Sequence, residues 1–442
     1  MNQRRWILAA AAVLGLLLAV IAGVFLWHEM GKDYADAKAV AVSAADGSAV
    51  AGDMSGQGAG GQGGAGSQDA TGDQGNAGFQ GAGFQNATGG AGSQDVIGGQ
   101  GDTGPQDTAG GQGSTGSQDT TGGQGGTDSV LRFVFAGDVL LSDHVLAAYE
   151  RGGGIRGVVD EELQAVIDTS DIFMVNEEFP FSDRGSAAAD KQYTFRLPPE
   201  KVSMFHELGI DIVSLANNHA LDFGTDALLD TCRTLDEAGI YRVGAGKNLE
   251  EAKQPVILEI KGKKIGFLGA SRVIPEGSWN ASSTKPGMLT TYDPALLLEE
   301  IKKVRETCDY VIVYVHWGIE RHDRPEEYQR SLGQQYIDAG ADIVIGSHPH
   351  VLQGLEYYKG KPIVYSLGNF VFGSSIPKSM LLTVDWDGQN VNLALVPATS
   401  SAGYTRAVTD EGQKAAFFQY MTDLSYEVTV GEDGSVSEKK PD

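Results

Sequence analysis

The stretch Ala341-Asp342-Ile343-Val344-Ile345-Gly346-Ser347-His348-Pro349-His350 decides the class of fold. Its apolar half has the length of a buried strand, and two histidines follow directly, separated by a proline that stiffens the turn. Proteins of the α/β class bind their ligands at the ends of such strands. Because imidazole is the commonest transition-metal ligand, His348 and His350 are candidate ligands of one metal ion or of two neighbouring ions.

A lone histidine in such a turn would be read as a solvated polar residue. Six of the eight histidines of the chain, however, lie between His206 and His350, and several of them follow other apolar runs. This clustering favours a shared binding site over unrelated surface residues.

From residue 129 onward, apolar runs alternate with amphipathic stretches, which is typical of a layered α/β fold. Buried strands are predicted at 131–136, 172–175, 210–215, 310–315, 343–345 and 363–365. Helices are predicted at 225–238, 294–307, 325–339 and 411–424, two of them with proline in the first turn. Hairpins are predicted at 256–268 and 380–396, and a short strand at 426–430. The simplest interpretation is one mixed sheet with helices outside it.

The N-terminal segment has the pattern of a membrane anchor. Arg4 and Arg5 precede residues 6–27, which contain no charge and are long enough to cross a bilayer as one helix. The arginines place the N-terminus in the cytoplasm and the rest of the chain outside the membrane. A cleaved signal peptide is the alternative, but no small-residue cleavage pattern follows Trp27.

Residues 28–128 are dominated by Gly, Gln, Ser, Thr, Asp and Ala. They have too little apolar surface to offset the entropy of ordering, so a disordered stalk is predicted. The predicted organisation is a cytoplasmic N-terminus at 1–5, an anchor at 6–27, a stalk at 28–128, a folded domain at 129–400 and a C-terminal extension at 401–442.

The formal charge of -25 argues against nucleic acid as a partner, because the overall field repels polyanions. An anionic substrate would need a local positive centre, such as a metal ion. Cys232 and Cys308 are interpreted as buried apolar residues, with a single disulfide as the alternative.

Five consecutive strand exits carry oxygen or imidazole side chains. These residues are Asp138, Asn176 to Glu178, Asn217 to His219, His316, and His348 with His350. The exits of parallel strands share one edge of a sheet, so the side chains are expected to converge. Each residue alone could be a helix cap, a turn residue or a satisfied core residue. Together they suit two divalent ions of Zn, Mn or Fe, bridged by a carboxylate.

His219 is the candidate catalytic residue, as a general acid or as a group that holds the oxyanion of the substrate. Asp222 stands three residues later, where its carboxylate could fix the tautomer of the imidazole.

The order of the motifs resembles the capsule synthesis protein CapA family, which is associated with poly-gamma-glutamate production and export. The match covers roughly residues 131–400. Its six motifs are Gly137-Asp138, Asn176-Glu177-Glu178, Asn217-Asn218-His219-Ala220-Leu221-Asp222, His316-Trp317-Gly318-Ile319-Glu320, Gly346-Ser347-His348-Pro349-His350-Val351-Leu352-Gln353-Gly354 and Ser366-Leu367-Gly368-Asn369-Phe370.

That family is similar to the calcineurin-like metallophosphoesterases. The resemblance implies a four-layer α/β/β/α fold with mixed sheets and a two-metal centre. By the same resemblance, His219 is the catalytic histidine, and the metal ligands are Asp138, Glu178, Asn218, His316, His348 and His350.

Three positions depart from the superfamily pattern. Leu140 stands where its Asp-x-His motif has histidine, and Asp143 or His144 are the residues that could replace that ligand. Glu178 stands in place of a shorter bridging aspartate, and Ser347 where the family commonly has histidine.

Asn176, Arg196 and Glu320 are the candidate substrate-binding residues. The guanidinium of Arg196 could bind a carboxylate or a phosphate, or could pair with a neighbouring acid.

The leading hypothesis is a single-pass, extracytoplasmic membrane protein of capsular polymer synthesis or export. Its expected partners are the membrane, the polymer or its precursor, and other membrane subunits of a capsule synthase. The alternatives are a metal-dependent hydrolase of an envelope phosphoester or peptide, and a non-catalytic scaffold of the synthase.

Overall fold

The computed structural model describes residues 130–439. The N-terminal segment, anchor and stalk at 1–5, 6–27 and 28–128 lie outside these described residues and stay predictions. Among residues 130–439, no helix has both the length and the apolar composition needed to cross a bilayer.

The larger of two main sheets has ten strands and is mixed. Its main path runs β17 (Val428–Val430), β18 (Ser435–Glu438), β15 (Val391–Ser401), β14 (Ser375–Trp386), β1 (Leu131–Val139), β2 (Ile172–Glu177), β3 (Ile212–Ser214) and β4 (Tyr241–Val243). In addition, β13 (Asn369–Val371) pairs with β1, and β16 (Tyr404–Ala407) pairs with β15. Strands β1 to β4 are parallel, whereas β14 and β15 are antiparallel.

The second sheet has six strands. Their order is β11 (Leu352–Tyr358), β12 (Lys361–Leu367), β10 (Ile343–Ser347), β9 (Tyr310–His316), β7 (Lys263–Ser271) and β6 (Val256–Ile260). The four central strands are parallel, and an antiparallel strand closes each edge. A separate pair is formed by β5 (Ala245–Gly246) and β8 (Gly287–Met288).

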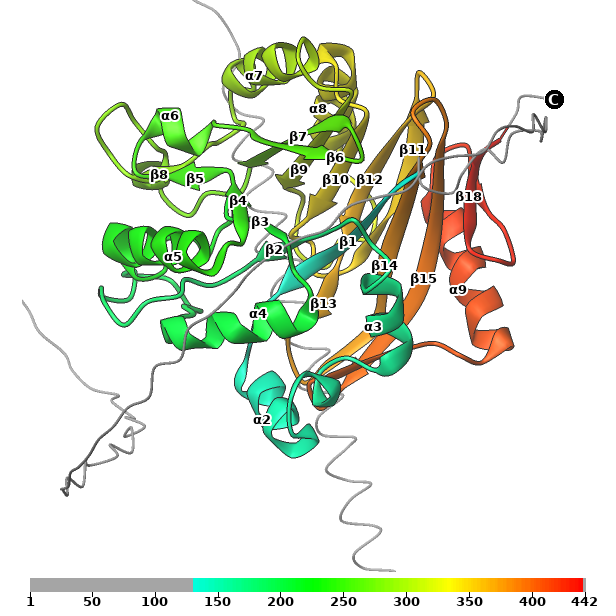
Figure 1. The fold of residues 1–442 in the computed structure, drawn as a ribbon, viewed down its shortest axis with the longest axis horizontal. Helices are drawn as coiled ribbons and strands as arrows, with labels where there is room; N and C mark the ends of the chain where they lie inside the picture. Colours follow the sequence, from blue (N-terminus) through cyan, green and yellow to red (C-terminus); the bar gives the residue numbers. More distant parts are fainter. Residues whose placement is uncertain (1–129, 440–442) are drawn as a thin grey trace, which may run out of the picture. The chain divides into compact units, whose positions relative to one another are not determined.

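Helices cover the outer faces of both sheets (Figure 1). The first group is α2 (Asp143–Gly152), α3 (Glu161–Ile167), α4 (Ser203–Leu208) and α5 (Gly224–Ala238), and the second is α7 (Ala295–Arg305) and α8 (Glu327–Ala339). The remaining helices are α6 (Leu249–Ala252) and α9 (Glu411–Leu424), with short 3-10 turns η2 (Ile155–Gly157), η3 (Pro199–Val202) and η4 (Gly277–Trp279).

The alternation of side chains along the strands explains why the two sheets face each other. In β9, Ile312 and Tyr314 enter the core between the sheets, whereas Val311 and Val313 enter the core under α7 and α8. A strand buried on both faces reads as a continuous apolar run, as this one does. From the opposite sheet, Phe133 packs against Tyr310 with ring centroids 5.8 Å apart. The layers therefore follow the order helix, sheet, sheet, helix.

The predicted mixed α/β fold is confirmed. The apolar runs belong to two main sheets, as the resemblance implied, rather than to the single mixed sheet of the simplest interpretation. Of the strands that carry site residues at their ends, β1, β2 and β3 lie in the larger sheet, and β9 and β10 lie in the smaller one. Apolar runs alone do not state which sheet a strand joins. The helices at 225–238 and 411–424 are found almost as predicted, and Pro294 and Pro325 precede the first helical residue rather than lying within the first turn.

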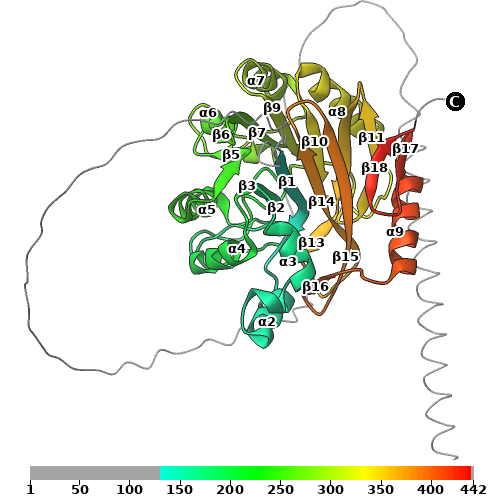
Figure 2. The same cartoon turned by 45° about the vertical axis from the view of Figure 1, so that its right-hand side comes forward.

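Residues beyond 400 add three strands to the larger sheet. Helix α9 lies beside β17 and β18 (Figure 2), and its Phe417, Phe418 and Met421 complete the core between the sheets. Cys232 and Cys308 are buried and free, which confirms the interpretation of both as apolar core residues.

Strand β1 passes unusually close to the chain after β12 where it delivers Asp138. The amide of Asp138 donates to the carbonyl of Gly368 over 2.8 Å. A Cβ atom at Gly137 would lie only 1.8 Å from that same carbonyl oxygen. Glycine at 137 therefore sets the distance between the first and last motifs of the site.

We expect Gly137→Ala to lower the free energy of unfolding by about 1–3 kcal/mol or more, because the backbone must move to admit the methyl group. Urea denaturation followed by circular dichroism measures this change. Gly277→Ala is the matched control, since a Cβ there meets nothing within 4 Å. Equal denaturation midpoints for the two variants would contradict the role of this close approach.

Candidate metal centre

The polar side chains at the strand exits converge from both sheets. Asp138 and Asn176 are paired across β1 and β2, and Ser347 and His316 across β10 and β9. The Asn176 amide donates to Asp138 Oδ1 over 2.8 Å and to Glu178 Oε1 over 3.3 Å, and lies 3.3 Å from His316 Nδ1. This buried amide therefore joins the two sheets at the centre of the site.

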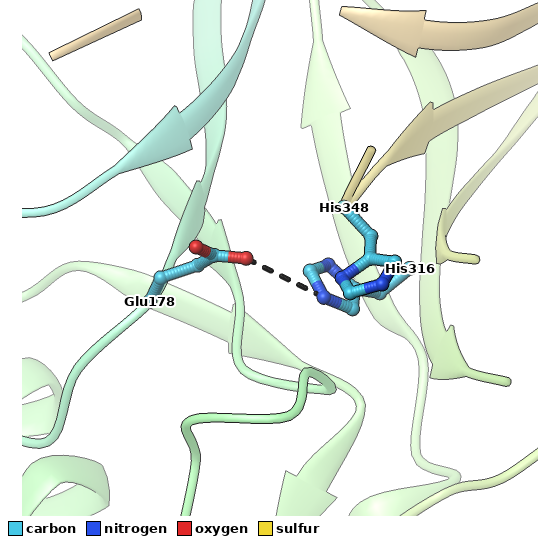
Figure 3. Close-up of side chains that lie close together, drawn as sticks. All are labelled: Glu178, His316 and His348. Atoms are coloured by element: carbon cyan, nitrogen blue, oxygen red, sulfur yellow. Dashed lines mark ion pairs between the residues drawn. The ribbon is translucent and has the colours of Figure 1, made fainter. Parts of the chain in front are cut away.

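Two groups of potential metal ligands share Glu178. One group is Glu178, His316 and His348, and the other is Asp138, Glu178 and His350. In each group the ligand atoms lie within 4.8 Å of one another. Figure 3 shows Glu178 facing the imidazole of His316, with Oε1 3.4 Å from Nε2, and His348 beside the same ring. A shared carboxylate is the arrangement that a bridged pair of ions requires.

Several buried atoms in this cluster lack a partner among the described residues. They include Glu178 Oε2 and His348 Nδ1, and both side chains are almost fully buried. An unpaired buried carboxylate oxygen costs free energy unless a cation or donor reaches it. The unpartnered atoms and the donor types therefore fit a divalent ion of the Zn, Mn or Fe kind.

The electrostatics of the cluster also suit cation binding. Burial raises the pKa of Glu178 well above its usual range, and the negative charge of Asp138 raises it further. Burial, followed by the charge of His350, lowers the pKa of His348 to about 4, so that its ring is neutral at pH 7. A neutral imidazole is the form that binds metal ions. Burial likewise lowers the pKa of His316 well below its usual value.

His350 differs from the other two histidines. Burial lowers its pKa, but attraction by Glu178 and a hydrogen bond with Asp138 outweigh this effect and raise the pKa to about 10. Its Nδ1 lies 2.8 Å from Asn369 Oδ1 and 3.4 Å from Asp138 Oδ2. The same carboxylates that attract a proton to His350 would attract a divalent ion, and an ion bound there would lower this pKa and favour the neutral ring that binds metal.

Asn218 lies where the resemblance implies a ligand. Its Oδ1 is 2.8 Å from His316 Nε2, the same nitrogen that faces Glu178. Ser347, in turn, lies behind His316, with its hydroxyl 3.1 Å from Nδ1. The serine therefore orients the ring rather than facing the ligand cluster.

His219 and Asp222 form a close pair. Nδ1 of His219 lies 2.7 Å from Asp222 Oδ2, which also accepts from the amide of Phe195 over 2.7 Å. Burial lowers the pKa of His219, although Asp222 opposes this effect. With Nδ1 donating to Asp222, Nε2 of the neutral ring carries no proton and is an acceptor.

Lys191 is a site residue that sequence reasoning missed. Its ammonium donates to Asp222 Oδ1 and to the carbonyl of Asn218, and lies 3.0 Å from His219 Nδ1. The ammonium also lies 5.2 Å from the ring centroid of Trp279. Lys191 belongs to an irregular loop without periodicity, so no local signal in the sequence marks it.

A cleft of about 440 Å³ opens beside the cluster. It is lined by Lys191, Gln192, Tyr193, Phe195, Asn218, His219, Glu320, Arg321, His350 and Phe372. Glu320 thus lies at the cleft, as a substrate-binding residue must. Asn176 is fully buried within the network, and Arg196 instead donates to the carbonyl of Arg184 over 2.9 Å and stacks on Phe223.

The structure does not bring Asp143 or His144 into the cluster. Both are exposed on α2, and neither belongs to a ligand group among residues 130–439. Leu140 packs into the core under the helices. His350 instead lies with Asp138 and Glu178. The ligand group at Asp138 therefore contains an imidazole, although Leu140 stands where the superfamily has its histidine.

The fold and the cluster together define an α/β protein with a candidate metal centre at the ends of strands from two facing sheets. Residues 132–374 match the family model described as bacterial capsule synthesis protein PGA_cap, and the chain belongs to this family. The resemblance inferred from the six motifs is thereby confirmed.

Two relatives carry related names. The chain is 32% identical over 303 residues to the capsule biosynthesis protein CapA of Bacillus anthracis, which corresponds to 66% of this chain and 73% of the relative. It is 34% identical over 247 residues to the PGA biosynthesis protein CapA of Bacillus subtilis, which corresponds to 55% of this chain and 64% of the relative. The chain therefore spans only part of each relative.

Among solved structures, a 5'-nucleotidase from Candida albicans aligns with 60% of this chain and 51% of its own length. The sequence identity is 10% and the TM-score is 0.32. A likeness of this size carries no inference about the activity of the chain.

Asp230 of α5 anchors the loop that carries Lys191. It accepts from the guanidinium of Arg184 over 2.6 and 2.8 Å and from the hydroxyl of Ser182 over 2.7 Å. Hydrogen bonds from Arg184 hold the pKa of Asp230 well below its usual value.

We expect Asp230→Asn to lower the free energy of unfolding at pH 7 by about 1–2 kcal/mol, because the buried Asp230 loses its charge-assisted hydrogen bonds with the half-exposed guanidinium of Arg184. The lowered native pKa means that this stabilisation is present above pH 4 and is lost as the pH falls further. The difference in the free energy of unfolding between the wild type and Asp230→Asn, measured by urea denaturation, should therefore become smaller below about pH 4.

Asp226→Asn is the matched control on the same helix. Its side chain is exposed and lies 3.7 Å from Arg184 Nη1, so a change below about 0.5 kcal/mol is expected. If Asp230→Asn remained less stable than the wild type by the same free energy down to pH 2, the assigned ion pair between Asp230 and Arg184 would be contradicted.

Proposed function

We propose that this protein is a membrane-anchored, extracytoplasmic component of capsular polymer synthesis or export, acting on poly-gamma-glutamate or its precursor. The family membership and the names of the relatives support the process. The uncharged segment at 6–27, preceded by two arginines, supports the anchor and its orientation. Other membrane subunits of a capsule synthase are the expected partners.

We further propose that the site is a two-metal centre of the metallophosphoesterase type in a four-layer fold. The observation that carries this proposal is the sharing of Glu178 by two ligand groups, one of which reaches the cleft through His350. Glu178, Asn218, His316 and His348 would hold one ion, and Asp138, Glu178 and His350 the other. Such ions, when bound, polarise a substrate oxygen and stabilise negative charge that develops on it.

The side chains of the protein have separate tasks in this site. His219 lines the cleft, and its Nε2 can accept a proton from a group bound there. Asp222 holds the tautomer, and Lys191 holds Asp222 in place while its charge disfavours an imidazolium at His219. The pair of His219 and Asp222 is thus suited to accept a proton from the bound molecule before it donates one.

The cleft also reconciles an acidic chain with an anionic polymer. The formal charge of the chain is -25, so attraction over the whole surface is unfavourable. Among residues 130–439, the cleft is lined by the cations Lys191 and Arg321 and by one acidic residue, Glu320, and bound ions would add further positive charge. Recognition is therefore local to the cleft.

A metal-dependent hydrolase of an envelope phosphoester or peptide is the second candidate. The close pair of His219 and Asp222 favours it, because a buried carboxylate that fixes an imidazole is typical of general acid and base catalysis. A non-catalytic scaffold is the remaining alternative, and metal content separates it from the other two.

We expect the full-length protein to bind about two divalent ions per chain, measured by inductively coupled plasma mass spectrometry. Glu178→Ala should lose both ions, because both groups use this carboxylate, whereas His348→Ala and His350→Ala should each lose one. His206→Ala, an exposed histidine on α4, is the control and should retain wild-type content. Fewer than one ion in the wild type would favour the scaffold.

We expect deletion of the gene to abolish the capsular polymer and the wild-type gene to restore it. His219→Ala should retain its metal ions yet lower polymer yield by about 100-fold, since a positioned acid or base contributes at least that factor. His206→Ala again serves as the control. Normal polymer in the deletion strain would refute the proposed process, and full restoration by His219→Ala would refute the catalytic role.

A further inference from the structure

Arg321 differs from every other arginine among residues 130–439. The other twelve each donate a hydrogen bond to a described residue, and most of them pair with a carboxylate. No such partner is present for the guanidinium of Arg321 within this part of the chain. A guanidinium offers five donors, so this residue has unused capacity to bind an anion.

The backbone around Arg321 is held in an unfavourable conformation. Arg321 has φ 63°, in the left-handed region that favours glycine, and its amide donates to the carbonyl of Pro349 over 2.8 Å. On either side of Pro349, His348 and His350 also have positive φ, at 102° and 59°. Strain of this kind persists only where the surrounding structure enforces it, and it concentrates at functional sites. The same contact fixes the position of Arg321 relative to the candidate ligands.

Other cations near the cleft already have partners. The ammonium of Lys191 donates to Asp222 and Asn218, and the ring of His350 lies against Asn369 and Asp138. Arg196, which the sequence suggested as an anion-binding residue, donates to carbonyls of its own loop. Arg321 is therefore the cleft cation, among the described residues, that remains available for a ligand.

The walls of the cleft restrict what such a ligand can be. Tyr193, Phe195 and Phe372 line it beside Arg321 and His350. Aromatic walls exclude water and contact apolar atoms, whereas a planar guanidinium binds carboxylate or phosphate through two parallel hydrogen bonds. The matching ligand therefore has an oxyanion attached to a short apolar chain or to an ester.

We propose that Arg321 is a substrate-binding residue whose guanidinium holds an oxyanion, either a carboxylate or a phosphate, of the molecule that occupies the cleft. The inference rests on the proposed function, because it assumes that the metal centre and the cleft form one site. Arg321 is not a ligand of either candidate metal group, so its role can be tested apart from metal binding.

The test uses the full-length, metal-loaded protein in detergent and isothermal titration calorimetry with two probes. Inorganic phosphate tests whether the oxyanion is a phosphate, and a trimer of γ-linked glutamate tests whether it is a carboxylate. We expect Arg321→Gln to weaken binding of at least one probe by about 10- to 100-fold, with unchanged metal content. The probe that is affected identifies the class of oxyanion.

Two further variants make the result specific. Arg321→Lys keeps the charge but lacks the planar fork, so a smaller loss is expected. Arg406→Gln removes the same charge from an exposed residue of β16 outside the cleft and should bind both probes as the wild type does.

Wild-type affinity of Arg321→Gln for both probes would overturn the inference, as would a metal-loaded wild type that binds neither probe. Both results leave the metal centre intact and so leave the proposed function standing. A wild type without bound metal would refute the metal centre and the inference together, and the separate metal measurement identifies that case.

Discussion

Two carboxylates buried side by side impose the constraint on which the site depends. Asp138 and Glu178 are both fully buried, and the pKa of Glu178 is raised by burial and by its neighbour. Like charges in a poorly solvated place need donors or cations around them. The Asn176 amide of β2, together with the amide of His348 and the ring of His350 in the turn after β10, supplies part of this compensation. A divalent ion bound between the two sheets would supply the rest.

This constraint accounts for the local distortion of the chain. The turn after β10 holds two histidines in left-handed backbone, the loop after β9 holds Arg321 likewise, and β1 passes Gly368 at a distance that only glycine allows. Each feature costs stability and is supported by the rigid sheets on either side. Three residues with positive φ, His348, His350 and Arg321, therefore lie where side chains from the two sheets meet.

Much of the fold could be read from the chain, because the relevant signals are local. The continuous apolar run at 310–315 and the 14-residue stretch at 411–424 are long enough to be recognised, and they are found as β9 and α9. Helices α3 and α4 were not predicted, since they have only 7 and 6 residues and too few turns to show a period. Among the site residues, Lys191 had no local signal, and Arg196 lay on a loop whose course the sequence does not specify.

By itself, the sequence determined the kind of chemistry and the order in which its residues arrive, because motifs such as Asn217 to Asp222 and Gly346 to His350 follow strands whose apolar runs are recognisable. Tertiary structure alone decided which residues meet. It divided the strands between two sheets, excluded Asp143 and His144 from the cluster, and brought Lys191 to His219 and Arg321 to the cleft. The physical reason is that strand pairing and loop packing depend on contacts between residues far apart in the chain, which no local pattern records.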